Sequence, residues 1–69
     1  MPYTYREVSR KLKDLGFTLL RHGKGSHVVF GKKEIRVIVP NHGGKTISPG
    51  VERKIIGATG LSGDEFRKV

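Results

Sequence analysis

The fold is decided by residues 17–40, which have the sequence FTLLRHGKGSHVVFGKKEIRVIVP. Apolar and polar residues alternate over much of this stretch, and a period of two is typical of β-strands. We predict three strands separated by short connections, over residues 17–21, 27–31 and 34–39. Because the connections are short, successive strands should pair as an antiparallel sheet. Pro40 has no amide proton for a ladder, so the third strand is expected to end there.

A helix is predicted before this stretch. Thr4 and Glu7 have the spacing of a capping box, in which the Thr4 side chain caps the helix and the Glu7 side chain reaches back. Apolar residues follow at helical spacing, and Gly16 suits the left-handed cap that ends many helices. We expect the other faces of this helix to be exposed and largely basic, and they carry Arg6, Ser9, Arg10, Lys11, Lys13 and Asp14.

Two further helices are predicted after the strands. Ser48 and Pro49 form a helix start signal, and Gly60 is a stop signal. Ser62 and Glu65 repeat the capping-box pattern and open a short last helix. The expected fold is therefore α+β, with the order α-β-β-β-α, a short C-terminal helix and an antiparallel three-stranded sheet covered on one face by two helices. Double-stranded-RNA-binding domains have the same order of elements.

Composition and charge narrow the class of function. With 69 residues, the chain is expected to form a single domain over residues 1–69. Lysine and arginine number 14 against 6 acidic residues, and the formal charge of +8 indicates an acidic partner, either nucleic acid or protein. The absence of cysteine excludes a disulfide scaffold and a thiol nucleophile. No apolar run approaches the roughly 20 residues of a membrane helix, so we expect a cytoplasmic protein with no membrane partner. We also expect the chain by itself to be a monomer.

Two common kinds of site do not fit the sequence. Residues 44–46, GKT, resemble the end of a phosphate-binding P-loop, but Val39 stands where the first glycine of that loop is needed. The three histidines, His22, His27 and His42, match no spacing of zinc ligands. We therefore expect neither ATP nor a metal, and no other cofactor.

The stretch RHGKGSH, from Arg21 to His27, is the strongest candidate for chemistry. Its two glycines and its lysine make a flexible basic loop that can approach a phosphate closely. His27 follows where the loop enters the apolar run VVF, and histidine is the side chain best able to exchange protons near neutral pH. If Val28 and Phe30 face the core, His27 points to the other face of the sheet, where a ligand can reach it. The alternative is that His27 is an exposed strand residue with no functional role.

Metal-free cleavage of RNA needs proton transfer and a cation that stabilises the charge on phosphorus. His27 is our candidate for the base or the acid, and a positioned side chain in this role typically contributes about 10²–10⁴-fold. The charge would be stabilised by cations and backbone amides of the basic loops, which are the candidate RNA-binding residues Lys24, Gly25, Ser26 and Lys45. The sequence does not choose between His42, His22 and water as the second proton-transfer group.

In their order and spacing, these motifs resemble the HicA toxins of HicA–HicB toxin–antitoxin systems. The resemblance covers nearly all of the chain. It rests on Gly25-Ser26-His27, on Pro40 followed by His42-Gly43, on the run Lys45, Ile47, Gly50, Arg53 and Ile55, and on the tail residues Leu61-Ser62 and Glu65-Phe66.

The resemblance implies a double-stranded-RNA-binding-like fold and an endoribonuclease that cleaves mRNA independently of translation. It also implies that His27 is catalytic and that a HicB-like antitoxin masks the site. Two other functions stay open. A non-catalytic RNA-binding module would bind RNA with a steep salt dependence and leave it intact. A protein-interaction module would use the basic face to bind an acidic partner, and an antitoxin would be one such partner.

Overall fold

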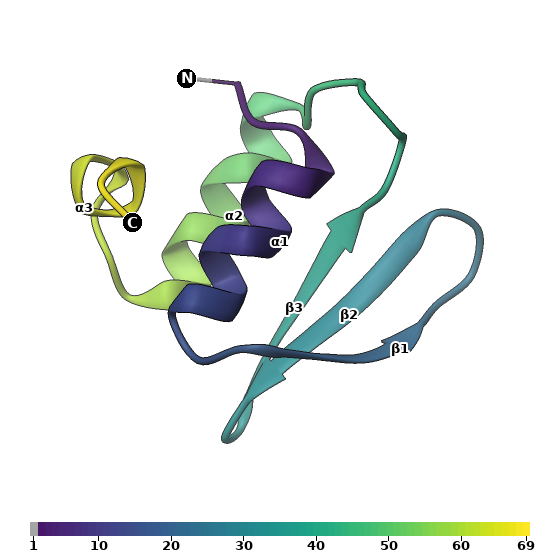
Figure 1. Ribbon diagram of the computed structural model, residues 1–69, viewed down its shortest axis with the longest axis horizontal. Helices are drawn as coiled ribbons and strands as arrows, with labels where there is room; N and C mark the ends of the chain where they lie inside the picture. The colour runs from purple at the N-terminus through teal and green to yellow at the C-terminus, as the bar shows by residue number, and fades with distance from the viewer. Residues whose placement is uncertain (1) are drawn as a thin grey trace.

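The computed structural model describes residues 2–69 and has the predicted α+β order of elements (Figure 1). The elements are α1 (Tyr5–Asp14), β1 (Thr18–His22), β2 (His27–Lys32), β3 (Ile35–Pro40), α2 (Pro49–Thr59) and α3 (Gly63–Arg67). The prediction of three strands between two helices, followed by a short C-terminal helix, is therefore confirmed. Among the residues described, no helix is long and apolar enough to span a membrane.

The strands form one antiparallel sheet in the order β1-β2-β3, so β2 is the central strand. Each strand begins within one residue of its predicted start. Pro40 is the last residue of β3, as expected, and it lies opposite His27, the first residue of β2. The loop between β1 and β2 and the segment that follows β3 therefore meet at one end of the sheet.

The predicted capping signals define where two of the helices begin. At α1, the Thr4 hydroxyl accepts from the Glu7 amide, and the Glu7 carboxylate accepts from the Thr4 amide. Ser62 and Glu65 form the same reciprocal pair at α3. Ser48 stands at the predicted N-cap of α2, but its side chain makes no capping hydrogen bond. The capping boxes at α1 and α3 are therefore confirmed, and α2 begins without a side-chain cap.

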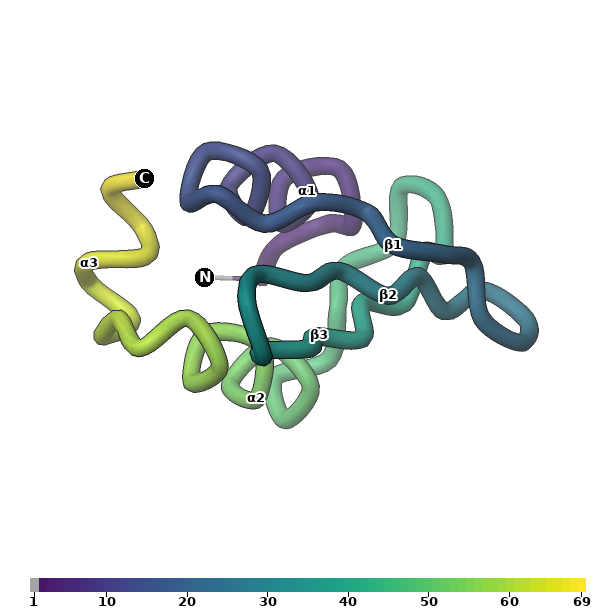
Figure 2. Tube along the Cα trace, turned by 90° about the horizontal axis from the view of Figure 1, so that it is seen from below, coloured from purple at the N-terminus to yellow at the C-terminus, as the bar shows by residue number. Residues whose placement is uncertain are grey.

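Both long helices cover the same face of the sheet (Figures 1 and 2). Within β2 the predicted alternation is confirmed, because Val28 and Phe30 are buried in the core while His27 is exposed. Val29 shares a face with His27 and is nevertheless only 9% exposed. It lies on the central strand between the side chains of its register partners, Arg21 and Ile38. The core itself contains Tyr3, Val8, Leu12, Phe17, Val28, Phe30, Val37, Val39, Ile47, Ile55 and Phe66.

The outer face of the sheet, away from the helices, carries exposed apolar surface. Ile38 is 57% exposed and Leu20 is 47% exposed. The register of β1 shifts between Leu19 and Arg21, so Leu20 is the extra residue of a bulge. A Cβ atom at Gly31 would stand only 2.5 Å from Cδ1 of Leu20. Glycine at this position of β2 therefore leaves room for the Leu20 side chain on the outer face.

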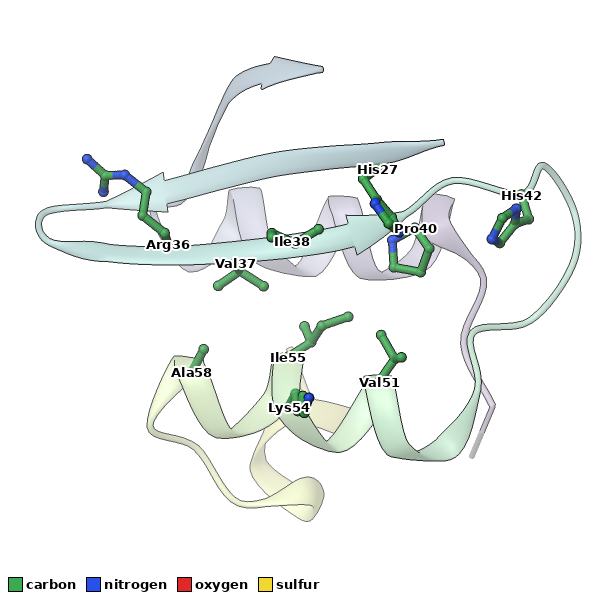
Figure 3. Close-up of a pocket in the computed structure, with 10 residues that line it drawn as sticks. All are labelled: His27, Arg36, Val37, Ile38, Pro40, His42, Val51, Lys54, Ile55 and Ala58. Atoms are coloured by element: carbon green, nitrogen blue, oxygen red, sulfur yellow. The ribbon is translucent and has the colours of Figure 1, made fainter. Parts of the chain in front are cut away.

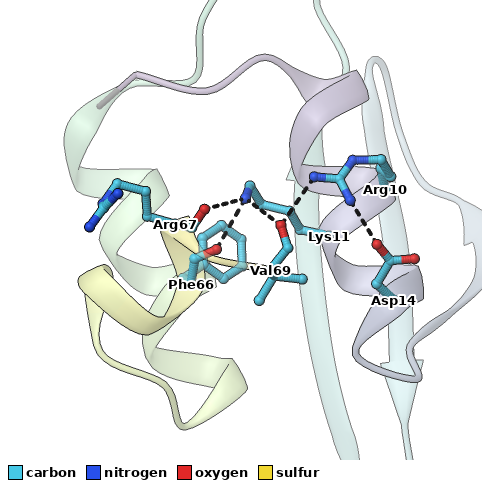
Figure 4. A network of polar contacts seen from close by, with 6 residues as sticks. All are labelled: Arg10, Lys11, Asp14, Phe66, Arg67 and Val69. Carbon is cyan, nitrogen blue, oxygen red and sulfur yellow. Dashed lines mark hydrogen bonds and ion pairs between the residues drawn. The ribbon is translucent and has the colours of Figure 1, made fainter.

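One expectation for α1 is wrong, because Lys11 and Ser9 are buried rather than exposed. Lys11 is 6% exposed, and its Nζ donates to the backbone carbonyls of Phe66, Arg67 and Val69, each at 3.1 Å (Figure 4). The same nitrogen lies 5.5 Å from the centre of the Phe66 ring, within the range of a cation–π contact. The C-terminal segment docks on α1 through this lysine, and that tertiary contact is not visible in the pattern of α1 alone.

Candidate functional site

The two basic loops lie together at one end of the sheet. The backbone amide of Asn41 donates to the carbonyl of Ser26 at 2.7 Å, which ties the segment after β3 to the loop between β1 and β2. The hydroxyl of Ser26 lies 3.5 Å from Nε2 of His42. His42 is therefore brought next to the residue that precedes His27, although the two histidines are far apart in the sequence.

His27 combines a fixed backbone with an available side chain. Its amide donates to the Lys24 carbonyl at 3.3 Å, and its carbonyl accepts from the Gly23 amide at 2.8 Å. Its ring is exposed, and within residues 2–69 no side chain forms a hydrogen bond with it. An exposed imidazole on a fixed stretch of backbone, with no side-chain hydrogen bond from the described residues, is suited to exchange a proton with a ligand.

His27 and His42 both line a cavity of about 540 Å³ between β3 and α2, which we call the β3–α2 groove (Figure 3). This volume falls within the range of small-molecule sites. Most lining residues are apolar, two are cationic, and none of those in the described chain is acidic. In addition to the histidines they are Arg36, Val37, Ile38, Pro40, Val51, Lys54, Ile55 and Ala58.

The structure separates the two histidines that the sequence left as candidates for the second proton-transfer group. His22 pairs with Val28, whose side chain is in the core, so His22 points to the face opposite His27. His22 is also not among the residues that line the β3–α2 groove, whereas His42 is. The described residues contain no group of three or more side chains that could together hold a metal ion.

The remaining predicted site residues form the rim beside the groove rather than its walls. Lys24 and Lys45 are exposed in their loops, and Ser26 is partly buried at the contact with His42. Gly25 has a φ of +61°, a left-handed conformation that glycine adopts without strain. A Cβ atom placed there would meet no atom within 4 Å. The loop surface at Gly25 is therefore open to a phosphate.

Sequence reasoning missed the two cations of the groove, Arg36 and Lys54. Arg36 alternates with Ile38 on β3, and Lys54 follows Val51 by one turn of α2. These patterns were visible in the sequence, but only the packing of α2 beside β3 shows that both cations line one cavity (Figure 3). The guanidinium of Arg36 also donates to the Lys33 carbonyl at 2.8 Å, which holds it at the hairpin end of the groove.

Fold and site together define a small basic α+β domain with a histidine-bearing groove, in the element order of double-stranded-RNA-binding domains. A family model described as HicA toxin of bacterial toxin-antitoxin matches residues 5–61. The chain therefore belongs to the HicA toxin family, as its motifs predicted, and is the toxin of a toxin–antitoxin system. Membership implies an antitoxin of HicB type as its partner. A comparison with curated proteins found no match.

Proposed function

We propose that the protein is an endoribonuclease that cleaves mRNA without a metal, with His27 and His42 as its proton-transfer groups. The observation that carries this proposal is the placement of both histidines in one groove beside two basic loops. The formal charge of +8 supports an RNA substrate, because a basic surface attracts the phosphate backbone. The match to the HicA toxin family supports an activity that is toxic to the cell.

The proposed chemistry uses a nucleophile that the substrate already contains. One histidine takes the proton from a 2′-hydroxyl while that oxygen forms a bond to the adjacent phosphorus. The other histidine gives a proton to the 5′-oxygen while the bond between phosphorus and that oxygen breaks. The products are a 2′,3′-cyclic phosphate and a 5′-hydroxyl end. Because one proton is taken and one is given, two histidines in opposite protonation states are sufficient.

The basic loops would stabilise the negative charge that develops on the phosphate oxygens. Lys24 lies three residues before His27 and Lys45 three residues after His42, and both lysines are exposed. The open backbone at Gly25 and Ser26 allows the phosphate to approach amide donors closely. Hydrogen-bond donors that are already in position stabilise this charge more than water does, because they need not reorganise in the transition state.

A cleavage assay on an unstructured RNA tests the proposal. We expect His27→Ala to slow cleavage by about 10²–10⁴-fold, the usual contribution of a positioned proton donor or acceptor. His42→Ala should also slow cleavage. His22→Ala is the matched control, because His22 is exposed but lies outside the groove, and it should retain the parental rate. Parental cleavage by a folded His27→Ala protein would contradict the catalytic role, and loss of cleavage in chelator would contradict the metal-free reaction.

The competing function is a module that binds RNA and does not cut it. Such a module would give steeply salt-dependent binding and full recovery of intact RNA after long incubation. Both functions therefore predict RNA binding, and only the ribonuclease predicts cleaved RNA. We also propose that the HicB-type antitoxin inhibits the toxin by covering His27, so RNA and antitoxin should compete for the protein.

A further inference from the structure

We infer that the β3–α2 groove is a subsite for one unstacked nucleobase of single-stranded RNA, beside the phosphate that is cut at His27. This inference rests on the proposed ribonuclease function and adds to it the form of the substrate and a residue that selects it. The groove is continuous with the proposed reaction centre, because His27, Pro40 and His42 form one end of its lining (Figure 3).

The walls of the groove have the chemistry that a base requires. Ile38 borders the groove from the exposed outer face of β3, while Val51 and Ile55 project from α2 toward the strand (Figure 3). Ile38 is 57% exposed, so it contributes little to the core of the free protein. Nucleobases have flat faces of low polarity, and proteins that bind single strands take unstacked bases on apolar, aromatic or guanidinium surfaces. An exposed isoleucine beside a histidine is suited to that contact.

The charges around the groove match a nucleotide rather than a neutral ligand. His27 and His42 lie at one end, Arg36 lies at the other, and Lys54 projects from α2 between them (Figure 3). No acidic side chain lines the groove within the described chain, so a phosphate at either end meets only cationic or neutral groups. A base in the middle of the groove would therefore have the two histidines near one flanking phosphate and Arg36 near the other, with Lys54 between them.

This geometry selects against double-stranded RNA. In a duplex the bases are stacked and paired, and a protein meets mainly the 2′-hydroxyls and phosphates. A base can enter the β3–α2 groove only after it has left the stack, which costs a few kcal/mol in a duplex and little in a single strand. The protein therefore has the element order of a domain that binds double-stranded RNA, together with a groove that fits a single strand.

A strand of an acidic protein partner is the other occupant to consider, and the packing disfavours it. Such a strand would add to the sheet through the free backbone groups of an edge strand. Of the two edge strands of the sheet, β1 and β3, only β3 borders the groove, and α2 runs alongside it with Val51 and Ala58 turned toward the strand (Figure 3). A base needs only the cavity between them and not the edge itself.

A binding assay that does not depend on cleavage tests the subsite. The probe is a short single-stranded RNA with one fluorescent 2-aminopurine, and all variants carry His27→Ala so that the RNA stays intact. We expect Ile38→Ala to raise the dissociation constant for this RNA by about tenfold, as for a truncated apolar contact in a pocket. The fluorescence change on binding should also become smaller. The matched control is Ile35→Ala, because Ile35 lies on the same strand, is 40% exposed and is outside the groove. A fully paired form of the same RNA should bind more weakly.

The subsite is wrong if Ile38→Ala and Ile35→Ala weaken RNA binding equally, or if the duplex binds as tightly as the single strand. It is also wrong if Ile38→Ala weakens binding to the antitoxin but leaves RNA binding unchanged. Cleavage by proteins that retain His27 separates this inference from the proposed function. If the parent cuts RNA and Ile38→Ala cuts at the same rate and the same positions, the subsite is wrong and the ribonuclease stands. If the parent does not cut RNA, the ribonuclease is wrong and the fluorescence assay still decides the subsite.

Discussion

Lys11 and Lys54 carry the same ammonium group, and the structure places them in opposite surroundings. Lys11 is 6% exposed, and its three donors reach three backbone carbonyls of the C-terminal segment, an arrangement we call the Lys11 clamp. Lys54 is exposed in the wall of the β3–α2 groove, and within residues 2–69 it forms no ion pair or side-chain hydrogen bond. A cation with all donors satisfied has none left for a ligand. The comparison therefore divides the basic residues into those that hold the fold and those whose donors remain free for a ligand.

The acidic residues reinforce this division. Asp14 pairs with Arg10 within α1 at 2.7 Å, and Asp64 pairs with Arg67 within α3. Glu7 and Glu65 are occupied as capping residues. The ion pairs of the described residues all lie in α1 and at α3, and none lies in the groove or the basic loops. Although acidic residues are present, they leave the positive charge of the site unneutralised.

The largest effect should appear at His27, and it should appear in activity alone. His27→Ala is expected to remove about 10²–10⁴-fold of the cleavage rate while the free energy of unfolding changes by no more than about 0.5 kcal/mol. The ring is exposed and makes no hydrogen bond with a side chain of residues 2–69, so its removal should leave the packing unchanged. Denaturant unfolding and RNA cleavage on the same sample measure both quantities. A large loss of stability in His27→Ala would contradict this prediction, because it would show that the His27 side chain also stabilises the fold.

The Lys11 clamp should show the reverse behaviour. Lys11→Met keeps an apolar stem but removes three hydrogen bonds to backbone carbonyls of the C-terminal segment. The carbonyls of Phe66 and Val69 keep other donors, whereas within the described residues the Arg67 carbonyl loses its donor, so we expect stability to fall by about 2 kcal/mol. For a domain of this size, that corresponds to a fall in Tm of roughly 10 °C. Lys13→Met is the control, because Lys13 is exposed on the same helix and should change little. Below the melting transition, Lys11→Met should cleave RNA at the parental rate. A loss of cleavage by the folded variant would contradict the division between lysines that hold the fold and lysines of the groove.

The fold was predictable because its signals are local. Alternation along residues 17–40 and the capping pair Thr4 and Glu7 fix the strands and the first helix without knowledge of tertiary contacts. His27 was found because alternation with Val28 sends it to the outer face. The burial of Lys11 was missed because its acceptors lie more than fifty residues away in the sequence.

The groove was missed for a related reason. It requires that β3 and α2 pack side by side, and neither element contains that information alone. The choice of His42 over His22 likewise depends on the hydrogen bond between Asn41 and Ser26, which turns the second loop toward the first. Long-range packing therefore decides which of the predicted residues lie close together.

A smaller effect is expected from the cations of the loops. A lysine that binds a phosphate of single-stranded RNA contributes about 0.7 to the slope of log K against log salt, so its replacement by alanine should make that slope shallower by the same amount. We expect this change for Lys24→Ala and for Lys45→Ala, measured by RNA binding in proteins that also carry His27→Ala. Lys13→Ala serves as the control, because Lys13 is also exposed but lies on α1 and does not line the groove. An equal change for Lys13→Ala would indicate general charge attraction rather than binding by the loops.

The smallest effect should arise at the hairpin between β2 and β3, which belongs to neither region. Lys33 has a φ of 55°, and among residues 2–69 it is the one residue other than glycine with a positive φ. The left-handed region costs most side chains about 1–2 kcal/mol, and asparagine tolerates it better. Lys33→Asn should therefore raise the free energy of unfolding by about 0.5 kcal/mol. Glu34→Asn is the control within the same turn, because Glu34 does not share this conformation.

The hairpin substitution also tests how rigidly the groove is held. The Lys33 carbonyl accepts from Arg36, which lines the far end of the groove from His27. Lys33→Asn keeps this backbone acceptor, so the position of Arg36 and the rate of RNA cleavage should be unchanged. If stability rises and cleavage also changes, the hairpin conformation controls the groove through Arg36. If the free energy of unfolding falls instead, asparagine does not relieve strain at residue 33. The prediction that the left-handed conformation of Lys33 costs stability is then wrong.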